Sequence, residues 1–371
     1  MNVKTNGEWL KWTFWSKQMP KTSIGTRNTR LRSIDVHAHV FLKDSFEEMR
    51  KKHPKYVPRI TPTPDGNYEI TAWDGTDHDT RHRRAVDLDF RLSEMARLGI
   101  GMQALSTMPS VLGKLPFDRF FYDIESDAAL DFCKAMNEGM RGVVDKFPDR
   151  FVGLATVPLQ DVGGSVDELE RAVKELGLRG VEIGSHVNGR NLDDRELWPF
   201  YAEVEKLGFP IMIHPAEPPG RDRLSNYQLV NFIGFPLETT IAGASLIFGG
   251  VFKDFPRLKV YFVHGGGFLP YQRGRFEHGY EMREDPKKHI KNVPPSEYFK
   301  LLYFDVLTHD QKAMEYLISS VGTKRTMLGT DYPWDMADPD LVDRIARVKS
   351  LSETDKERIL WKNAAELFKL D

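Results

Sequence analysis

Three features are scarce in this sequence: cysteine, long apolar runs and an excess of charge of either sign. The single cysteine, Cys133, cannot form a disulfide within the chain, so we expect a reducing, cytoplasmic setting. No apolar stretch of membrane-spanning length stands out and no signal-peptide core precedes a cleavage site, which predicts a soluble protein without a membrane partner. Because 52 basic residues balance 54 acidic ones, charge gives no reason to expect a nucleic-acid partner.

The chain is long enough for one large α/β barrel with insertions. Its 371 residues divide into an N-terminal extension, residues 1–32, and one expected domain over residues 33–371. The extension is basic and carries Trp9, Trp12 and Trp15 ahead of a stretch rich in Ser, Thr and Arg. Three interpretations stay open: an arm that packs on a neighbouring subunit or on the barrel, a flexible extension, and an organelle transit segment.

Short apolar runs alternate with longer amphipathic ones in the expected domain. Helical spacing is clear in residues 164–176 and 194–207, where apolar residues recur every three or four positions. The alternation predicts an α/β fold with parallel strands, and eight strands predict a closed (β/α)8 TIM barrel. An open, doubly wound sheet is the alternative, although no glycine-rich phosphate loop follows the first strand. The expected strands are 33–40, 102–109, 151–158, 180–185, 210–215, 259–264, 301–307 and 325–331.

Two connections are unusually long for such a barrel. Residues 41–86 form a long loop insertion after the first expected strand, and residues 216–235 follow the fifth. In a barrel both would lie over the carboxyl ends of the strands, where active sites are built. We therefore expect both loops to enclose a substrate.

The first expected strand, "IDVHAHV" at residues 34–40, contains His37 and His39. Residues i and i+2 of a strand point to the same face, so the two imidazoles would project side by side. In a helix they would point about 200° apart. Two neighbouring neutral imidazoles at one end of a strand can chelate a divalent metal ion.

Further groups that bind metals or protons occur at the ends of other expected strands. His214 in "IMIHP" ends the fifth strand, His264 in "YFVHG" ends the sixth, and Asp331 in "LGTDYP" ends the eighth. The carboxyl ends of barrel strands meet at one face, so these groups would converge with the histidine pair. Each residue alone is more often a structural histidine or a capping aspartate. Their regular recurrence predicts a metal site.

These residues and the motifs around them resemble one family within the amidohydrolase superfamily. An H-x-H on the first strand, single histidines after the fifth and sixth, and an aspartate after the eighth are similar to the superfamily pattern. The runs "QALSTMP", "RFVGLATVPLQ", "GVEIGSHVN", "GFPLETTIA" and "GGVFKDFPRLKVYFVHGGG" resemble, more narrowly, the 2-amino-3-carboxymuconate-6-semialdehyde decarboxylase family. The resemblance runs from about residue 33 to the C-terminus and leaves out the N-terminal extension.

The resemblance implies a single Zn²⁺ per chain, and another divalent ion would also suit these ligands. In the family's pattern three histidines and an aspartate hold the ion, and a further histidine, here His264, stays off the metal and acts in proton transfer. Asp331 could share in the proton movement. The fourth expected strand lacks the lysine that relatives with two metal ions carry, which favours one ion over two. The residues that match the ligands are His37, His39, His214 and Asp331.

Residues that contact the substrate are implied by the same resemblance. Arg275 matches a family arginine that reaches a substrate carboxylate, in dimeric members from the neighbouring subunit, so a homodimer is implied. Independently of the resemblance, Phe41 after the histidine pair and Trp334 after Asp331 are expected to form apolar walls of the pocket, with ordinary core packing as the alternative for both.

The loop after the first strand departs from the family pattern. Pro64 and Glu69 stand where well-known members carry a lysine and an arginine. An anionic Glu69 would repel a dicarboxylate, so we expect a different small-molecule carboxylic acid, such as an aromatic one. Three arginines could substitute for the missing cations, namely Arg59, Arg81 and Arg83.

The leading interpretation is therefore a zinc-dependent, non-oxidative decarboxylase of an unsaturated or aromatic carboxylic acid in a catabolic pathway. The alternative is a metal-dependent hydrolase or hydratase on the same scaffold, in which metal-bound water attacks the substrate. A non-catalytic metal-binding protein is a third interpretation. The presence of all five polar site residues argues against this last one.

Overall fold

The computed structural model describes residues 32–71, 78–81, 83–107 and 121–370. Within the chain, Leu31–Asp371 forms one compact unit. The expected N-terminal extension, residues 1–32, lies outside the described residues apart from Arg32. Everything below concerns the compact unit.

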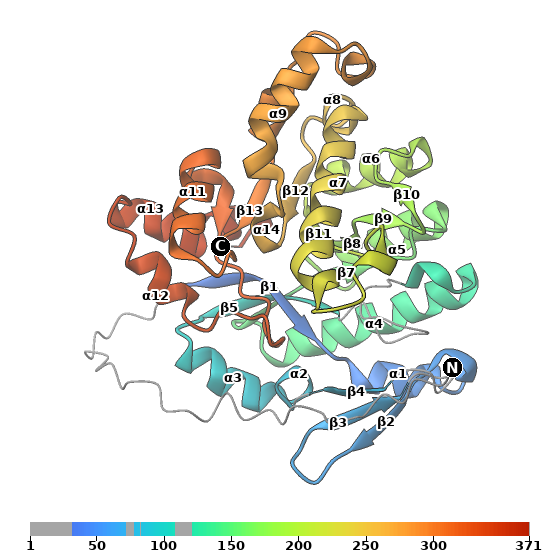
Figure 1. Cartoon of the computed structure of the whole chain (residues 1–371). Coiled ribbons are helices and arrows are strands. Elements are labelled where there is room, and N and C mark those ends of the chain that lie inside the picture. The colour runs from blue at the N-terminus through green and yellow to red at the C-terminus, as the bar shows by residue number, and fades with distance from the viewer. Residues whose placement is uncertain (1–31, 72–77, 82, 108–120, 371) are drawn as a thin grey trace, which may run out of the picture. The chain divides into compact units, whose positions relative to one another are not determined.

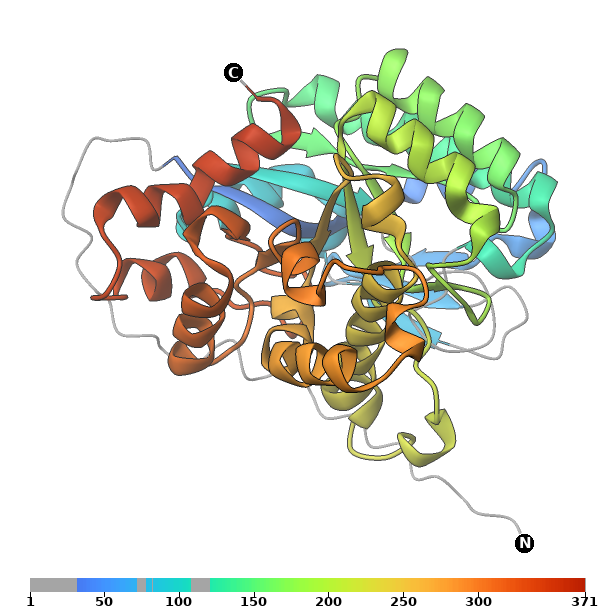
Figure 2. The ribbon, with the colours of Figure 1, turned by 90° about the horizontal axis from the view of Figure 1, so that it is seen from above.

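The expected (β/α)8 barrel is confirmed. Each strand pairs in parallel with the next along the chain, and β6 and β7 together fill the third position, since β5 pairs with β6 and β7 pairs with β8. Figure 2 shows the strands from above, with helices around them. The barrel strands are β1 (Ile34–Val40), β5 (Met102–Thr107), β6 (Phe151–Gly153), β7 (Ala155–Thr156), β8 (Val181–Gly184), β11 (Pro210–His214), β12 (Lys259–Phe262), β13 (Tyr303–Asp305) and β14 (Thr326–Met327).

The barrel closes where the chain beyond β14 meets β1. Val36 N donates to Leu328 O at 2.9 Å, and His39 N donates to Tyr332 O at 2.7 Å. The last expected strand, 325–331, is regular over only two residues, yet its continuation still pairs with β1 through a parallel bridge from Ala38 to Tyr332. The closure brings residues about 300 positions apart into one hydrogen-bonded seam.

Amphipathic helices cover the strands, and their local sequence fixes their ends. In α5 the Asp161 side chain accepts from Gly164 N at the N-cap, and Leu169 and Ala172 are buried. The helices expected over 164–176 and 194–207 are α5 and the pair η4 with α6. The helices that flank the barrel strands are α3 (Leu88–Arg97), α4 (Ser126–Lys146), α5 (Val162–Lys174), η4 (Arg195–Leu197), α6 (Trp198–Leu207), α7 (Phe235–Phe248), α8 (Val251–Asp254), α9 (Leu269–Met282), α10 (Pro295–Phe299), α11 (Gln311–Val321), α12 (Leu341–Ala346), α13 (Glu353–Glu357), η10 (Arg358–Lys362) and α14 (Asn363–Phe368).

The insertion after β1 contains regular structure that the sequence did not predict. It forms a small antiparallel sheet of order β2-β3-β4, at the bottom of Figure 1. Ile60 pairs with Ile70, and the buried Ile70 joins the main core. The elements of the insertion are α1 (Lys43–Met49), η2 (Pro54–Tyr56), β2 (Arg59–Pro62), β3 (Tyr68–Thr71), β4 (His78–Arg81) and α2 (Arg83–Val86).

The second long loop, residues 216–235, contains η5 (Arg221–Arg223) and η6 (Val230–Gly234), which continues into α7. By length and composition this helix, Val230–Phe248, could cross a membrane: it has 19 residues and a mean hydropathy of 1.3. The expectation that no such segment exists is qualified accordingly. One such helix is weak support for a span because core helices of soluble proteins share these properties, and Ala242 and Leu246 of this one are fully buried.

Candidate metal centre

The two histidines of β1 point into the barrel from the same face of the strand. His37 and His39 are fully buried, and their ring centroids lie 5.2 Å apart. The alternation of a strand produces this arrangement, as the sequence predicts. The first pair of ligands therefore sits on the rigid scaffold and not on a loop.

His214 and Asp331 complete a group of four. His214 ends β11, and Asp331 follows β14 in the segment that closes the barrel. One ligand atom from each residue lies within 4.8 Å of all the others. Asp331 Oδ1 is 3.3 Å from His37 Nε2 and 3.4 Å from His39 Nε2.

These four side chains fit a divalent cation. His37 Nε2, His39 Nε2 and Asp331 Oδ1 are buried and have no hydrogen-bond partner in the described structure, although such atoms are normally satisfied. Three imidazoles and one carboxylate are ligands that zinc and other first-row divalent ions accept. Among the described residues, these four therefore form a group at the carboxyl end of the barrel that could hold a divalent metal ion.

The pKa values of these groups suit metal binding. Burial lowers the pKa of both His37 and His214 well below the ordinary value, so these imidazoles are neutral at physiological pH. Burial acts to raise the pKa of Asp331, but the nearby His37 ring and the hydrogen bond with His264 outweigh it and hold the pKa well below its usual range. Neutral imidazoles and an ionised carboxylate are the forms that ligate metals.

His264 lies beside this group without belonging to it. Its ring centroid is 4.9 Å from that of His37, and its Nε2 is 3.5 Å from Asp331 Oδ2. Burial acts to lower the pKa of His264, but the Asp331 carboxylate outweighs it and raises the pKa. His264 Nδ1 is buried without a hydrogen-bond partner in the described structure. The ring is therefore placed to exchange a proton next to the metal group.

Each imidazole of β1 contacts a polar side chain of a neighbouring strand through its Nδ1 atom. Asp305 Oδ2, at the end of β13, lies 2.8 Å from His37 Nδ1. Ser106 Oγ, on β5, lies 2.9 Å from His39 Nδ1. Glu182 Oε1, on β8, is 3.8 Å from the same nitrogen and makes no hydrogen bond to it. Such partners fix the orientation and tautomer of metal-binding histidines.

A buried arginine supports β1 at the same level. Arg91 of α3 is fully buried and donates from Nη1 to Gln103 Oε1 at 3.0 Å and from Nη2 to the carbonyl of His39. Its guanidinium also lies 4.7 Å from the ring centroid of Tyr332, which follows Asp331. Arg91 thus links the segments that carry two of the ligands, a role the sequence did not indicate.

Two residues expected to line the substrate pocket lie in different surroundings. The ring of Trp334 is half-buried, and its centroid is 6.2 Å from that of His39. Phe41 is buried in the core, where it stacks on Phe46 at 5.2 Å between centroids. Trp334 is therefore next to the metal group, and Phe41 has the core packing that was its alternative interpretation.

Two further expected substrate contacts are exposed. Glu69 lies on β3 opposite Thr61, on the face away from the buried Ile70. Arg275 lies on α9, which extends at the top of Figure 1. Neither residue has a described contact with the four metal-binding side chains, so their contact with substrate stays a prediction. Of the arginines considered as substitutes, Arg59 is exposed on β2, and Arg83 pairs with Asp87 at 3.1 Å.

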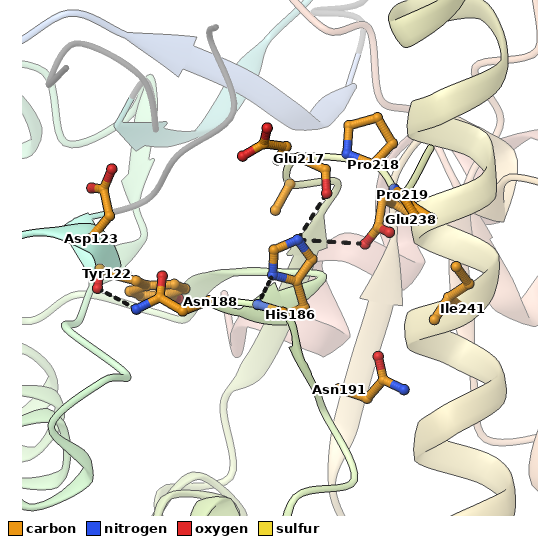
Figure 3. Close-up of a pocket in the computed structure, with 12 residues that line it drawn as sticks. Tyr122, Asp123, His186, Asn188, Asn191, Glu217, Pro218, Pro219, Glu238 and Ile241 are labelled. Carbon is orange, nitrogen blue, oxygen red and sulfur yellow. Dashed lines mark hydrogen bonds and ion pairs between the residues drawn. The ribbon is translucent and has the colours of Figure 1, made fainter. Parts of the chain in front are cut away.

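A cavity of about 440 Å³ lies beside the loop that follows His214 (Figure 3). Ser185 Oγ links its walls, because it accepts from Ala216 N and donates to Glu238 Oε2 at 2.7 Å. Among the residues that the structure describes, the lining contains carboxylates and no lysine or arginine, so it does not suit an anionic carboxylic acid. The lining residues are Tyr122, Asp123, His186, Asn188, Gly189, Asn191, Ala216, Glu217, Pro218, Pro219, Glu238 and Ile241.

With this fold and this metal site, the chain belongs to the amidohydrolase family, whose profile matches residues 34–370. The 2-amino-3-carboxymuconate-6-semialdehyde decarboxylase of Dictyostelium discoideum is 37% identical over 357 residues, which cover 92% of this chain and 93% of that protein. The resemblance read from the sequence is thereby confirmed.

Two further relatives bear on the chemistry. The crystal structure of a dihydroxybenzoic acid decarboxylase from Polaromonas sp. JS666, with bound manganese and the inhibitor 2-nitroresorcinol, superposes with a TM-score of 0.72 at 26% identity and covers 91% of this chain and 97% of that one. A 2-keto-4-carboxy-3-hexenedioate hydratase from Sphingobium is 30% identical over 220 residues, 56% of this chain and 60% of that protein.

Proposed function

We propose that this protein is a metal-dependent, non-oxidative decarboxylase of an unsaturated or aromatic carboxylic acid. One observation carries the proposal: four convergent ligands and one histidine kept apart from them occupy the carboxyl end of an amidohydrolase barrel. The long, nearly full-length similarity to a decarboxylase supports this reaction over others on the same scaffold.

The reaction replaces a carboxylate by a proton, so R–COO⁻ and H⁺ give R–H and CO₂. The protein must deliver that proton to carbon or stabilise the carbanion that forms. His264 and Asp331 are the proposed catalytic groups, because His264 Nε2 lies 3.5 Å from Asp331 Oδ2 and the pair can share a proton next to the site. A bound divalent ion would supply positive charge that orients and polarises the substrate.

We propose that the ion is Zn²⁺, one per chain. Three imidazoles and one carboxylate support zinc, whereas the manganese in the Polaromonas structure shows that a related site accepts a different ion. Elemental analysis of protein purified without added metal tests this proposal. One equivalent of zinc is expected, and stoichiometric manganese would replace zinc in the proposal.

The substrate-binding residues form part of the same proposal. Trp334 would pack against the carbon skeleton beside the metal, and Glu69 would disfavour a second carboxylate. Arg275 would reach a substrate carboxylate across a homodimer interface, which its exposure on α9 supports, together with Tyr271 of that helix at 77% exposure. Sedimentation should show dimers for both wild type and Arg275→Ala. Turnover assays should show a raised KM for the variant only.

We further propose a cytoplasmic location, which the single, buried thiol of Cys133 supports.

Product analysis separates decarboxylation from the competing chemistry. The enzyme should be offered 2-amino-3-carboxymuconate-6-semialdehyde and a panel of hydroxylated benzoic acids in water labelled with ¹⁸O. We expect release of CO₂ and an organic product without ¹⁸O. The similarity to a hydratase makes water addition the second candidate, and incorporation of ¹⁸O into the organic product without CO₂ would establish it instead.

A further inference from the structure

Asp305 touches both parts of the proposed active centre. It is fully buried at the end of β13, and its two carboxylate oxygens accept four hydrogen bonds. Oδ2 accepts from His37 Nδ1 at 2.8 Å and from His264 N at 3.0 Å. Oδ1 accepts from Gly265 N at 2.7 Å and from Leu307 N at 3.2 Å.

The contact with His37 determines which nitrogen of that ring can bind a metal. A carboxylate accepts, so Nδ1 must carry the proton and Nε2 must offer its lone pair. His37 Nε2 is the atom that faces Asp331 Oδ1 at 3.3 Å. Asp305 therefore selects the tautomer that a ligand at this position requires.

The contacts with His264 and Gly265 hold an unusual turn. His264 has φ of 55° and is followed by Gly265, Gly266 and Gly267 with φ of 62°, 76° and 60°. The left-handed conformation costs a residue other than glycine about 1–2 kcal/mol, so His264 adopts it only where other contacts impose it. The backbone N–H groups of His264 and Gly265 both donate hydrogen bonds to the Asp305 carboxylate, which fixes the turn against β13.

We propose that Asp305 is a positioning residue that couples the metal ligand His37 to the proton-transferring His264. The Asp305 carboxylate orients His37 through the imidazole ring and His264 through its backbone N–H. The position of the proton donor relative to the metal therefore depends on Asp305. This inference rests on the proposed function, because it assumes that the four convergent ligands bind a metal.

Asp305→Asn tests the coupling with the smallest change in shape. An amide has one acceptor oxygen, so its NH₂ group must face either the donors of His37 and His264 or those of Gly265 and Leu307. We expect metal affinity, measured by competition with a chromogenic chelator, to fall about 10- to 100-fold. At saturating metal, kcat should fall by a larger factor than KM changes, because the His264 turn is displaced.

Asp161→Asn is the matched control, because the half-buried Asp161 side chain caps α5 and asparagine also serves as an N-cap. It should keep wild-type metal affinity. A folded Asp305→Asn protein with unchanged metal affinity overturns the proposal. Wild type that binds no metal defeats the proposed function instead, so the two failures are distinguishable.

A measurement on the wild type covers the case in which Asp305→Asn does not fold. Histidine labelled with ¹⁵N in the zinc-loaded protein reports which ring nitrogen is protonated, and His37→Gln assigns the resonance. We expect Nδ1 of His37 to be protonated and hydrogen-bonded. A His37 ring protonated at Nε2 overturns the proposal.

Discussion

At the scale of single residues, metal binding and proton transfer are assigned to different side chains: the four convergent ligands bind the metal, and His264 moves the proton. His264 lies off the group whose ligand atoms are mutually within 4.8 Å, yet its ring packs against that of His37. Binding the metal and moving the proton should therefore respond to different substitutions.

His264→Asn should leave metal content unchanged and lower turnover about 10²- to 10⁴-fold, the usual contribution of a positioned proton donor or acceptor. Asparagine tolerates the left-handed backbone of this position better than alanine, so the turn is retained. His214→Ala is the contrasting variant and should lose the metal itself. Metal analysis and turnover measured on the same samples check both, and an active His264→Asn enzyme removes this residue from the mechanism.

Glu182 predicts a dependence of stability on pH. Burial raises the pKa of this carboxyl well above its ordinary value of 4.5, so the folded protein holds the proton that the unfolded chain releases. As pH rises above about 4.5, ionisation of the unfolded state lowers the free energy of unfolding, by at most about 1.4 kcal/mol per pH unit. Glutamine has the same shape and cannot ionise.

Glu182→Gln in the metal-free protein should therefore gain stability over wild type as pH rises from 5 to 7, with little difference near pH 4.5. Urea denaturation at several pH values measures this. Parallel curves for wild type and Glu182→Gln would mean that Glu182 is ionised in the folded protein.

Residues that orient others were the hardest to recognise in the sequence. His37, His39, His214 and Asp331 could be identified because each ends an expected strand with a side chain that binds metals. Asp305 also lies in an expected strand, but a lone acid in an apolar run carries no periodic signal. The partner that gives such an acid its role, for example His37 for Asp305, is 268 positions away in the sequence.

At the scale of elements, the connection between β12 and α9 is the most constrained segment near the site. Gly267 has φ of 60° and ψ of −123°, and a Cβ added there would lie 2.2 Å from the carbonyl oxygen of Pro236. Only glycine fits such a place without movement of the backbone of α7.

Gly267→Ala should therefore lower the free energy of unfolding by more than about 2 kcal/mol and should reduce activity by moving His264. Gly142→Ala, within α4, is the matched control because a Cβ there meets nothing within 4 Å. That change should stabilise the protein by about 0.5–1 kcal/mol. Urea titrations of the two variants against wild type check the contrast, and equal effects would contradict it.

The elements themselves were predictable to different degrees. The eight barrel strands and the helices α5 and α6 follow from hydrophobic periodicity, which packing against the core enforces. The sheet β2-β3-β4 was not predictable in this way, because Ile70 is the one buried side chain among the residues of β2 and β3. Strands that short carry too few apolar positions to show an alternation.

At the scale of the whole molecule, the metal site joins three distant parts of the barrel. Its ligands come from β1, from β11 and from the segment after β14. A cation that binds only the folded state should therefore stabilise the entire barrel and not one loop.

Removal of the metal with a chelator should lower the melting temperature, and added metal should restore it. The stabilisation is about 4 kcal/mol when free metal exceeds Kd 1,000-fold. His214→Ala should melt at the same temperature with or without metal. Differential scanning calorimetry measures these shifts. If neither chelator nor added metal changes the melting temperature of the wild type, no ion is bound at this site.

The seam between β1 and the segment after β14 has a consequence for biosynthesis. His37 and His39 are translated 294 and 292 residues before Asp331. Nascent chains must therefore carry two unpaired metal-binding imidazoles through most of translation, and any product that stops before Asp331 has an incomplete ligand set. A complete set of ligands therefore exists only after Asp331 has been translated.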